Sequence, residues 1–165
     1  MALGFVQDLR RDAPICRWRV GGVTVDVMPT LEEILGFANR WYPLALETAQ
    51  AIALPGGRII RLIAAPVFLA TKLEAFDGRG EGDFLFSHDL GDLLAVVDGR
   101  DALRDECRIS PPELRAYLAE RFQGLLAQPA FMDVLPGHLP GDAASQERLP
   151  DLLAKLNAIA GLQLP

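Results

Sequence analysis

Four charged side chains in the first hundred residues have the types and spacing to act together chemically. Asp26 interrupts an apolar strand pattern, Lys72 lies at the edge of a helical apolar stripe, and Asp89 and Asp92 are three residues apart. Carboxylates bind divalent cations and accept protons, and a lysine ammonium neutralises anionic oxygens. These residue types would suit a metal ion that holds a small anionic ligand.

Asp26 is predicted to lie opposite Arg17 in a β-hairpin over residues 15–28. Apolar and polar residues alternate on both sides of Gly21-Gly22, a pair that suits a two-residue turn with positive φ. Strands disfavour Asp, so strand propensity does not explain why Asp26 occupies this position. That reason is either a metal ion or an ion pair with Arg17, worth under about 1 kcal/mol if exposed.

Lys72 and the two later carboxylates each have a functional and a structural interpretation. Lys72 and Lys155 are the only lysines among the 16 Lys and Arg residues, which favours a role for Lys72 that needs a compact ammonium and that Arg cannot copy. Alternatively its stem covers the core and its head lies in water. Asp89 and Asp92 share a helix flank, and carboxylates also favour the first turn of a helix. Asp89 is closer to the apolar stripe and is the better functional candidate.

Composition excludes several classes of protein. A formal net charge of −6 and a pI near 4.9 argue against binding to nucleic acid by bulk electrostatics. The cysteines, Cys16 and Cys107, form no CxxC pattern, which favours reduced, buried thiols in a cytoplasmic protein. The first residues do not resemble a signal peptide, and no apolar run reaches the ~20 residues that span a bilayer. We therefore expect no membrane partner.

The two histidines, His88 and His138, do not fit a nucleophilic catalytic set by spacing. His138 lies in a Pro- and Gly-rich stretch and is expected at the surface.

The local patterns predict an α+β fold. In chain order they first indicate the hairpin, a short helix from Thr30 to about Asn39, strands over 45–54 and 58–63, a helix from Pro66 and a Gly-rich loop over 77–82. The Ala-rich residues 45–54 are also compatible with a helix. Further along the chain the patterns indicate a helix capped by Ser87, a helix from Pro111 to about Leu125, a loop over 129–144 and a last helix from Ser145 or Gln146. We expect an α+β core over residues 1–100 and a helical region over 101–165.

Three segments of the core, in order, resemble one protein family. Residues 16–18 (CRW) and 22–29 (GVTVDVMP), then 69–76 (LATKLEAF), then 88–93 (HDLGDL) are similar to the central hairpin, lysine helix and Asp-x-x-Asp helix of nucleotidyltransferase-like proteins of the DNA polymerase β superfamily. The likeness is closest to the toxins of abortive-infection, or type IV toxin–antitoxin, systems. It covers roughly residues 3–98 and implies a mixed β-sheet packed with helices.

The resemblance implies a magnesium-dependent reaction that transfers a nucleoside monophosphate from an NTP to an RNA or protein acceptor. Asp26 would hold the third carboxylate position at Mg²⁺ and help to deprotonate the acceptor, with Arg17 in support. Lys72 would contact the triphosphate, and Asp89, supported by Asp92, would organise the nucleotide-binding helix end. A cognate antitoxin would be a further partner.

The sequence departs from the family where a Gly-Ser motif and an Asp-x-Asp would precede the hairpin, because neither motif is present. We therefore expect a domain that is incomplete at its N-terminal side and shows no NTP turnover alone. A sheet edge left open in this way would favour a homodimer. The alternatives are a non-catalytic remnant that acts as an interaction domain and, third, an unrelated α+β domain.

Overall fold

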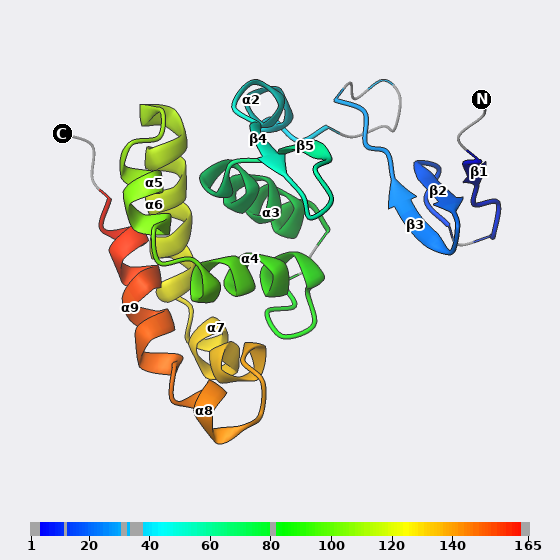
Figure 1. The fold of residues 1–165 in the computed structure, drawn as a ribbon. Helices are drawn as coiled ribbons and strands as arrows, with labels where there is room; N and C mark the ends of the chain where they lie inside the picture. The colour runs from blue at the N-terminus through cyan, green and yellow to red at the C-terminus, as the bar shows by residue number, and fades with distance from the viewer. Residues whose placement is uncertain (1–3, 12, 31–32, 34–37, 80–81, 163–165) are drawn as a thin grey trace. The chain divides into compact units, whose positions relative to one another are not determined.

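The computed structural model describes residues 4–11, 13–30, 33, 38–79 and 82–162 of the 165-residue chain. The chain consists of two compact units, Met1–Arg40 and Trp41–Pro165 (Figure 1). Helices occur together with short antiparallel sheets, which confirms the predicted α+β class. Among the described residues the strands form no mixed sheet, unlike the sheet that the resemblance implied.

The first unit contains a three-stranded antiparallel sheet in the order β1-β2-β3. Its strands are β1 (Val6–Gln7), β2 (Arg17–Val20) and β3 (Val23–Asp26). Gly21 and Gly22 have φ of 51° and 83°, the positive values that a tight two-residue turn requires. The predicted hairpin and its register are therefore confirmed. The helix expected from Thr30 to Asn39 lies mostly outside the described residues.

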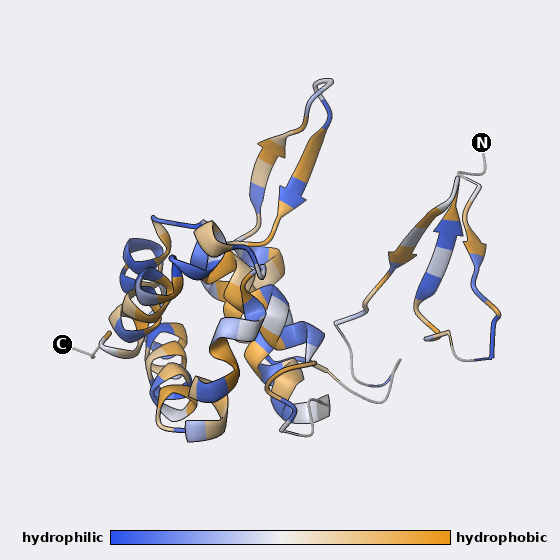
Figure 2. Ribbon diagram, turned by 90° about the horizontal axis from the view of Figure 1, so that it is seen from below, coloured by the Kyte–Doolittle hydropathy of each residue, from blue (hydrophilic) through white to orange (hydrophobic). Residues whose placement is uncertain are grey.

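The second unit begins with a helix and a β-hairpin. Helix α2 (Tyr42–Glu47) precedes β4 (Gln50–Ala53) and β5 (Ile59–Leu62), which pair antiparallel. Of the two alternatives for residues 45–54, the helix holds at the start of this stretch and the strand holds from Gln50 to Ala53. Pro43 in the first turn favours a helix, and the Thr48 hydroxyl donates to the Leu44 carbonyl at 2.7 Å near its end. Figure 2 shows this hairpin extending away from the helices of its own unit.

The core of the second unit lies between α-helices. These are α3 (Ala65–Arg79), α4 (His88–Gly99), α5 (Leu103–Arg108), α6 (Pro112–Leu126) and α9 (Leu149–Ala160). Helix α3 packs against α4 and α6, and α6 packs against α9 (Figure 1). The predicted stripes are confirmed, because Leu69, Leu73, Leu90 and Leu93 are fully buried. Helix α3 also includes Asp77–Arg79, which we had expected in the Gly-rich loop.

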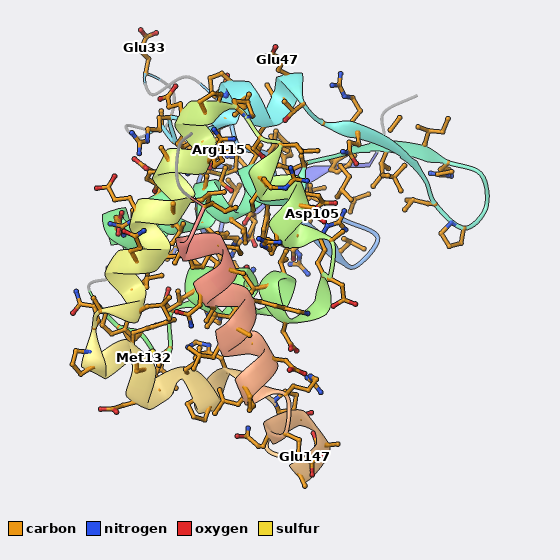
Figure 3. All side chains as sticks on the ribbon, turned by 90° about the vertical axis from the view of Figure 1, so that its left-hand side faces the viewer. Glu33, Glu47, Asp105, Arg115, Met132 and Glu147 are labelled. Carbon is orange, nitrogen blue, oxygen red and sulfur yellow. The ribbon has the colours of Figure 1, made fainter. Side chains whose placement is uncertain are left out.

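The boundary between the two compact units lies after Arg40, whereas we expected a boundary after residue 100. Helices α3 and α4 belong to the same unit as α6 and α9, and the division lies at Arg40. Arg115, which Figure 3 labels on α6, donates from its guanidinium to the Arg108 carbonyl oxygen at the end of α5 at 3.0 Å. The later helices therefore complete the core that α3 and α4 begin.

The stretch 129–144 is not the long loop that its prolines and glycines indicated. It folds into α7 (Pro129–Val134), the 3₁₀ helix η1 (Leu135–His138) and the start of α8 (Ala143–Gln146). Proline in the first turn starts a helix rather than preventing one, and Phe131 and Leu135 bury their side chains.

His138 is half-buried rather than at the surface as we expected. Its Nε2 atom lies 2.7 Å from the Phe84 carbonyl oxygen, so it joins η1 to the turn before α4.

Both cysteines are buried and unpaired, as predicted. Burial raises the pKa of the Cys107 thiol to about 12, so this thiol stays protonated at neutral pH.

Among the described residues, none of the helices combines the length and apolar character that crossing a membrane requires.

Candidate functional site

Lys72 on α3 binds two carboxylates of α4. Its Nζ atom lies 3.1 Å from Asp89 Oδ1 and 2.6 Å from Asp92 Oδ2. The Ser87 hydroxyl caps α4 by accepting from the Leu90 amide at 3.4 Å, which sets Asp89 in the first turn. Packing between α3 and α4 then brings the three charged residues together. We call Lys72, Asp89 and Asp92 the Lys72 cluster.

The two carboxylates of the Lys72 cluster differ strongly in exposure. The Asp89 side chain is 7% exposed and that of Asp92 is 56% exposed, while Lys72 is 21% exposed. The Lys72 ammonium also lies 5.5 Å from the centre of the Phe68 ring, within the range of a cation–π contact. Asp89 and Phe68 therefore hold the inner side of Lys72, and Asp92 binds it from the solvent side.

Lys72 keeps its positive charge in this setting. Burial by itself lowers the pKa of Lys72, but hydrogen bonds to Asp92 and Asp89 outweigh burial and raise that pKa above its usual 10.5. An ammonium has three donors, and the two carboxylates use two of them. The cluster can thus present a fixed cation to an anionic oxygen, with Asp92 as the partner most easily exchanged.

Arg17 and Asp26 form the predicted pair across the hairpin of the first unit. Arg17 Nε donates to Asp26 Oδ1 at 2.8 Å and Arg17 Nη2 donates to Asp26 Oδ2 at 2.9 Å. The hydrogen bonds from Arg17 lower the pKa of Asp26 below 3.8, against a smaller opposing effect of burial. Asp26 is therefore ionised at neutral pH, with both carboxylate oxygens bound to one guanidinium.

This geometry bears on whether Asp26 fits a magnesium ion. Mg²⁺ binds carboxylate oxygens in near-octahedral geometry, usually with water and substrate phosphates completing its shell. Both Asp26 oxygens already accept from Arg17, and the described residues contain no group of three or more His, Cys, Asp or Glu side chains that could hold a metal. Within the part of the chain that the structure describes, Asp26 is bound to Arg17 and has no second carboxylate beside it to share a magnesium ion.

The predicted site residues fall into two groups. Arg17 and Asp26 meet in the first unit, and Lys72, Asp89 and Asp92 meet in the second. The predicted pairing of Arg17 with Asp26 is confirmed, whereas the contacts of Lys72 with Asp89 and Asp92 were not predicted as pairs. A single constellation that joins Asp26 to Lys72 stays a prediction.

Sequence reasoning missed a second carboxylate–guanidinium pair in the first unit. Arg10 Nε lies 2.8 Å from Asp8 Oδ1 and 3.0 Å from Asp8 Oδ2, and the Asp8 side chain is 2% exposed. These hydrogen bonds lower the pKa of Asp8 from 3.8 to about 2. A signal existed in the spacing, because an aspartate side chain commonly accepts from the backbone amide two residues later, as Asp8 does from Arg10 at 3.2 Å.

The second lysine of the chain is held in the same way as the first. Lys155 Nζ on α9 lies 2.6 Å from the Asp98 carbonyl oxygen in the last turn of α4 and 2.9 Å from Asp101 Oδ1. Both lysines thus place a compact ammonium between two oxygen atoms, in keeping with the interpretation of the Lys-poor composition. Lys155 differs because it donates to a backbone carbonyl oxygen at the C-terminus of α4, where a positive charge is favourable.

Comparisons of the chain with protein-family models, with curated proteins and with solved structures found no match.

Proposed function

We propose that this protein is a nucleotidyltransferase-fold protein of the abortive-infection toxin type. The reaction would be magnesium-dependent transfer of a nucleoside monophosphate from an NTP to an RNA or protein acceptor, in the cytoplasm and under control of an antitoxin. The three segments that resemble the family occur in the family's order along the chain, which supports the proposed fold and reaction. The two free thiols are typical of a reducing compartment, which supports the cytoplasmic location. The observation that carries it is the position of Lys72.

Lys72 has the properties of a residue that binds phosphate. Asp89, nearly buried, fixes its ammonium, whereas the contact with the exposed Asp92 is of a kind that contributes little to stability. A phosphate oxygen can replace Asp92 or take the third donor without breaking the inner contact. Asp89 acts as the positioning residue, and Lys72 contacts the nucleotide.

The metal-binding role of Asp26 rests on the resemblance. For Mg²⁺ to reach this carboxylate, Arg17 would have to release at least one of its two hydrogen bonds. The Gly-Ser and Asp-x-Asp motifs that accompany this carboxylate in the family are not in the sequence. We therefore expect this chain to bind an NTP through Lys72 without turning it over alone.

Calorimetric titration with ATP, GTP, CTP and UTP, each with Mg²⁺, tests the proposal. We expect at least one NTP to bind and Lys72→Ala to weaken it by about tenfold or more, since a charge-assisted hydrogen bond contributes about 1.5–3 kcal/mol. Asp92→Asn should leave the affinity unchanged or raise it, because it removes a competing anion. Lys155→Ala is the matched control, since it removes the other lysine held between two oxygen atoms.

Two results would contradict the proposal. One is the absence of binding by all four nucleotides, and the other is an equal loss of affinity in Lys72→Ala and Lys155→Ala. A separate assay with α-labelled NTP examines turnover. Incorporation of label that Asp26→Ala abolishes would show that our expectation of an inactive chain is wrong.

A second candidate function, a non-catalytic interaction domain that forms a homodimer, is favoured by the β4–β5 hairpin. Because Ile52 pairs with Ile60 and side chains alternate along a strand, one face carries Ile52, Leu54, Ile60 and Leu62. These side chains are 37%, 40%, 39% and 49% exposed, and no third strand pairs with the hairpin among the described residues (Figure 2). An isolated two-stranded hairpin is marginally stable, so the same face of a second copy would stabilise it.

Light scattering after size exclusion tests this second candidate. We expect a dimer that the double variant Ile52→Glu/Ile60→Glu converts to a monomer, because the charges would be buried at the shared face. Ile59→Glu is the matched control, since Ile59 pairs with Ala53, is 72% exposed and lies on the opposite face. A wild-type chain that stays monomeric at all concentrations, or a dimer that Ile59→Glu disrupts equally, would exclude this dimer.

A further inference from the structure

A pocket of about 260 Å³ lies between α5, α9 and the turn that joins α4 to α5. Four apolar residues line it, namely Leu103 of α5 and Ala154, Ala158 and Ile159 of α9. Leu103 and Ile159 also belong to the buried core of the second unit. The pocket is smaller than the ~300–1,000 Å³ of pockets for drug-sized ligands, so it suits a small molecule with an apolar body. We call it the α5–α9 pocket.

Positive charge dominates the polar part of the α5–α9 pocket. Arg100, Arg104 and Lys155 line it together with a single carboxylate, that of Asp101. The chain as a whole has the opposite balance, with 22 Asp and Glu residues against 16 Lys and Arg residues. A concave site lined mainly by one sign of charge concentrates the electrostatic field and attracts ions of the other sign. The lining therefore favours an anionic ligand.

Arg104 is the cation of this pocket that is available to a ligand. It is exposed, and within the part of the chain that the structure describes it has no hydrogen-bond or ion-pair partner. Arg108, one turn later on the same helix, is also exposed but lies 3.4 Å from Asp105. The planar guanidinium of arginine matches the two oxygens of a carboxylate. Arg104 can therefore bind a carboxylate without losing another contact.

Arg100 is oriented by a neighbouring side chain and keeps donors for a ligand. Its Nε and Nη2 atoms donate to the two carboxylate oxygens of Glu106 at 2.7 and 2.6 Å. A guanidinium has five N–H donors, so this bidentate contact leaves those of Nη1 for a further acceptor. Arg100 thus adds a second, less mobile guanidinium to the pocket.

The contact between Lys155 and Asp101 indicates which anionic group suits the pocket. Lys155 Nζ lies 2.9 Å from Asp101 Oδ1, while its contact with the Asp98 carbonyl oxygen fixes it to α4. The Asp101 side chain is 98% exposed, and exposed ion pairs contribute little to stability. The carboxylate of a ligand can replace that of Asp101 or accept from the third donor of the ammonium. The lining thus already contains one contact between an ammonium and an exchangeable carboxylate.

We infer that the α5–α9 pocket binds a small organic acid, with a carboxylate head group and an apolar body. The carboxylate accepts from Arg104 and Lys155, with Arg100 as a further donor. The apolar body packs against the aliphatic side chains of α5 and α9. The inference uses no residue of the Lys72 cluster and does not rest on the proposed function, so it stands or fails separately from nucleotide binding.

NMR titration of the full, ¹⁵N-labelled chain with hexanoate tests the inference. We expect saturable shifts of the backbone amides over residues 100–104 and 154–159, the two segments that line the pocket. Hexanamide has the same body without the charge, and acetate has the charge without the body. Each should bind about tenfold more weakly than hexanoate or worse, because each lacks one half of the interaction. Added salt should weaken the binding of hexanoate.

Two pairs of variants locate the site. Arg104→Gln should weaken hexanoate binding by about tenfold or more, whereas Arg108→Gln, which removes the same charge from the same helix, should leave it unchanged. Ala154→Leu occupies part of the pocket and should also weaken binding. Ala95→Leu is its control, at an exposed helical position of α4 that does not line the pocket. Unchanged circular dichroism checks that all four variants fold.

Loss of hexanoate binding in Arg104→Gln and Ala154→Leu, with binding kept in both controls, supports the inference. It is overturned if hexanoate does not bind or if the two members of either pair act alike. Acetate that binds as tightly as hexanoate also overturns it, because surface charge alone would then attract the anion. Hexanamide that binds as tightly as hexanoate does the same, because the cations would then have no role.

Discussion

Lys72 and Asp89, which are 17 residues apart in sequence, form a hydrogen-bonded ion pair of 3.1 Å between two helices. The pair is asymmetric, because Asp89 is nearly buried while the second carboxylate on Lys72, that of Asp92, is largely exposed. One contact therefore belongs to the packing of α3 on α4, and the other faces solvent. This difference determines what each substitution should do.

We expect Asp89→Asn to destabilise the protein much more than Asp92→Asn. Asparagine keeps an acceptor oxygen but removes the charge that balances a partly buried ammonium, which should lower the free energy of unfolding by about 1–3 kcal/mol. Removing the exposed charge should change it by under about 1 kcal/mol. Urea denaturation of the two variants measures both values, and equal losses would show that the burial difference has no energetic effect.

The contribution of Lys72 to stability should disappear at alkaline pH. Its pKa is raised in the folded state, so its stabilisation is fully present below the unfolded value of 10.5 and is lost as pH rises through the higher folded value. The difference in unfolding free energy between wild type and Lys72→Met should therefore be constant near neutral pH and shrink above pH 10.5. A difference that persists unchanged would mean that packing of the lysine stem, and not its charge, stabilises the helix pair.

The ion pair between Arg17 and Asp26 should contribute little to stability despite its two hydrogen bonds. The side chains are 31% and 38% exposed, so solvent and salt screen the charges. A double-mutant cycle with Arg17→Met and Asp26→Asn should give a coupling energy under about 1 kcal/mol, smaller still at high salt. A coupling of several kcal/mol that does not respond to salt would require a more enclosed pair than the hairpin shows.

Asp8 should titrate far below an ordinary aspartate. Its pKa of about 2 means that its stabilising effect is present above pH 3.8 and is lost as pH falls towards 2. Carboxyl carbon chemical shifts should show this titration directly, and Arg10→Gln should return the pKa towards 3.8 because it removes the charged donor. A wild-type Asp8 with a pKa near 3.8 would contradict the hydrogen bonds from Arg10.

Features that depend on near neighbours were predictable from the sequence. Alternation around Gly21-Gly22 determined the hairpin and placed Arg17 opposite Asp26, nine residues apart. Ser87 and the apolar spacing after it determined α4 and its buried face. In each case the interacting groups lie within one turn or one hairpin, where backbone geometry alone sets which side chains meet.

Local patterns failed where proline was taken as a sign of loop. Residues 129–144 form short helices because Pro129 and Pro136 occupy first-turn positions, and Phe131 and Leu135 then find room in the core. The helix at Tyr42–Glu47 begins in the same way, with Pro43 in its first turn. Propensity could not separate these outcomes, since burial against other helices decides them.

The sequence by itself determined the candidate residues, the hairpin that carries Asp26 and the helices that carry Lys72 and Asp89. Only the tertiary structure decided their contacts: Lys72 with Asp89, His138 with Phe84 at a separation of 54, and Arg121 with Asp77 at a separation of 44. The physical reason is that periodicity specifies which face of a helix is apolar but not which other helix covers it. The inner and outer carboxylates of Lys72, and the α5–α9 pocket, exist only once those helices pack.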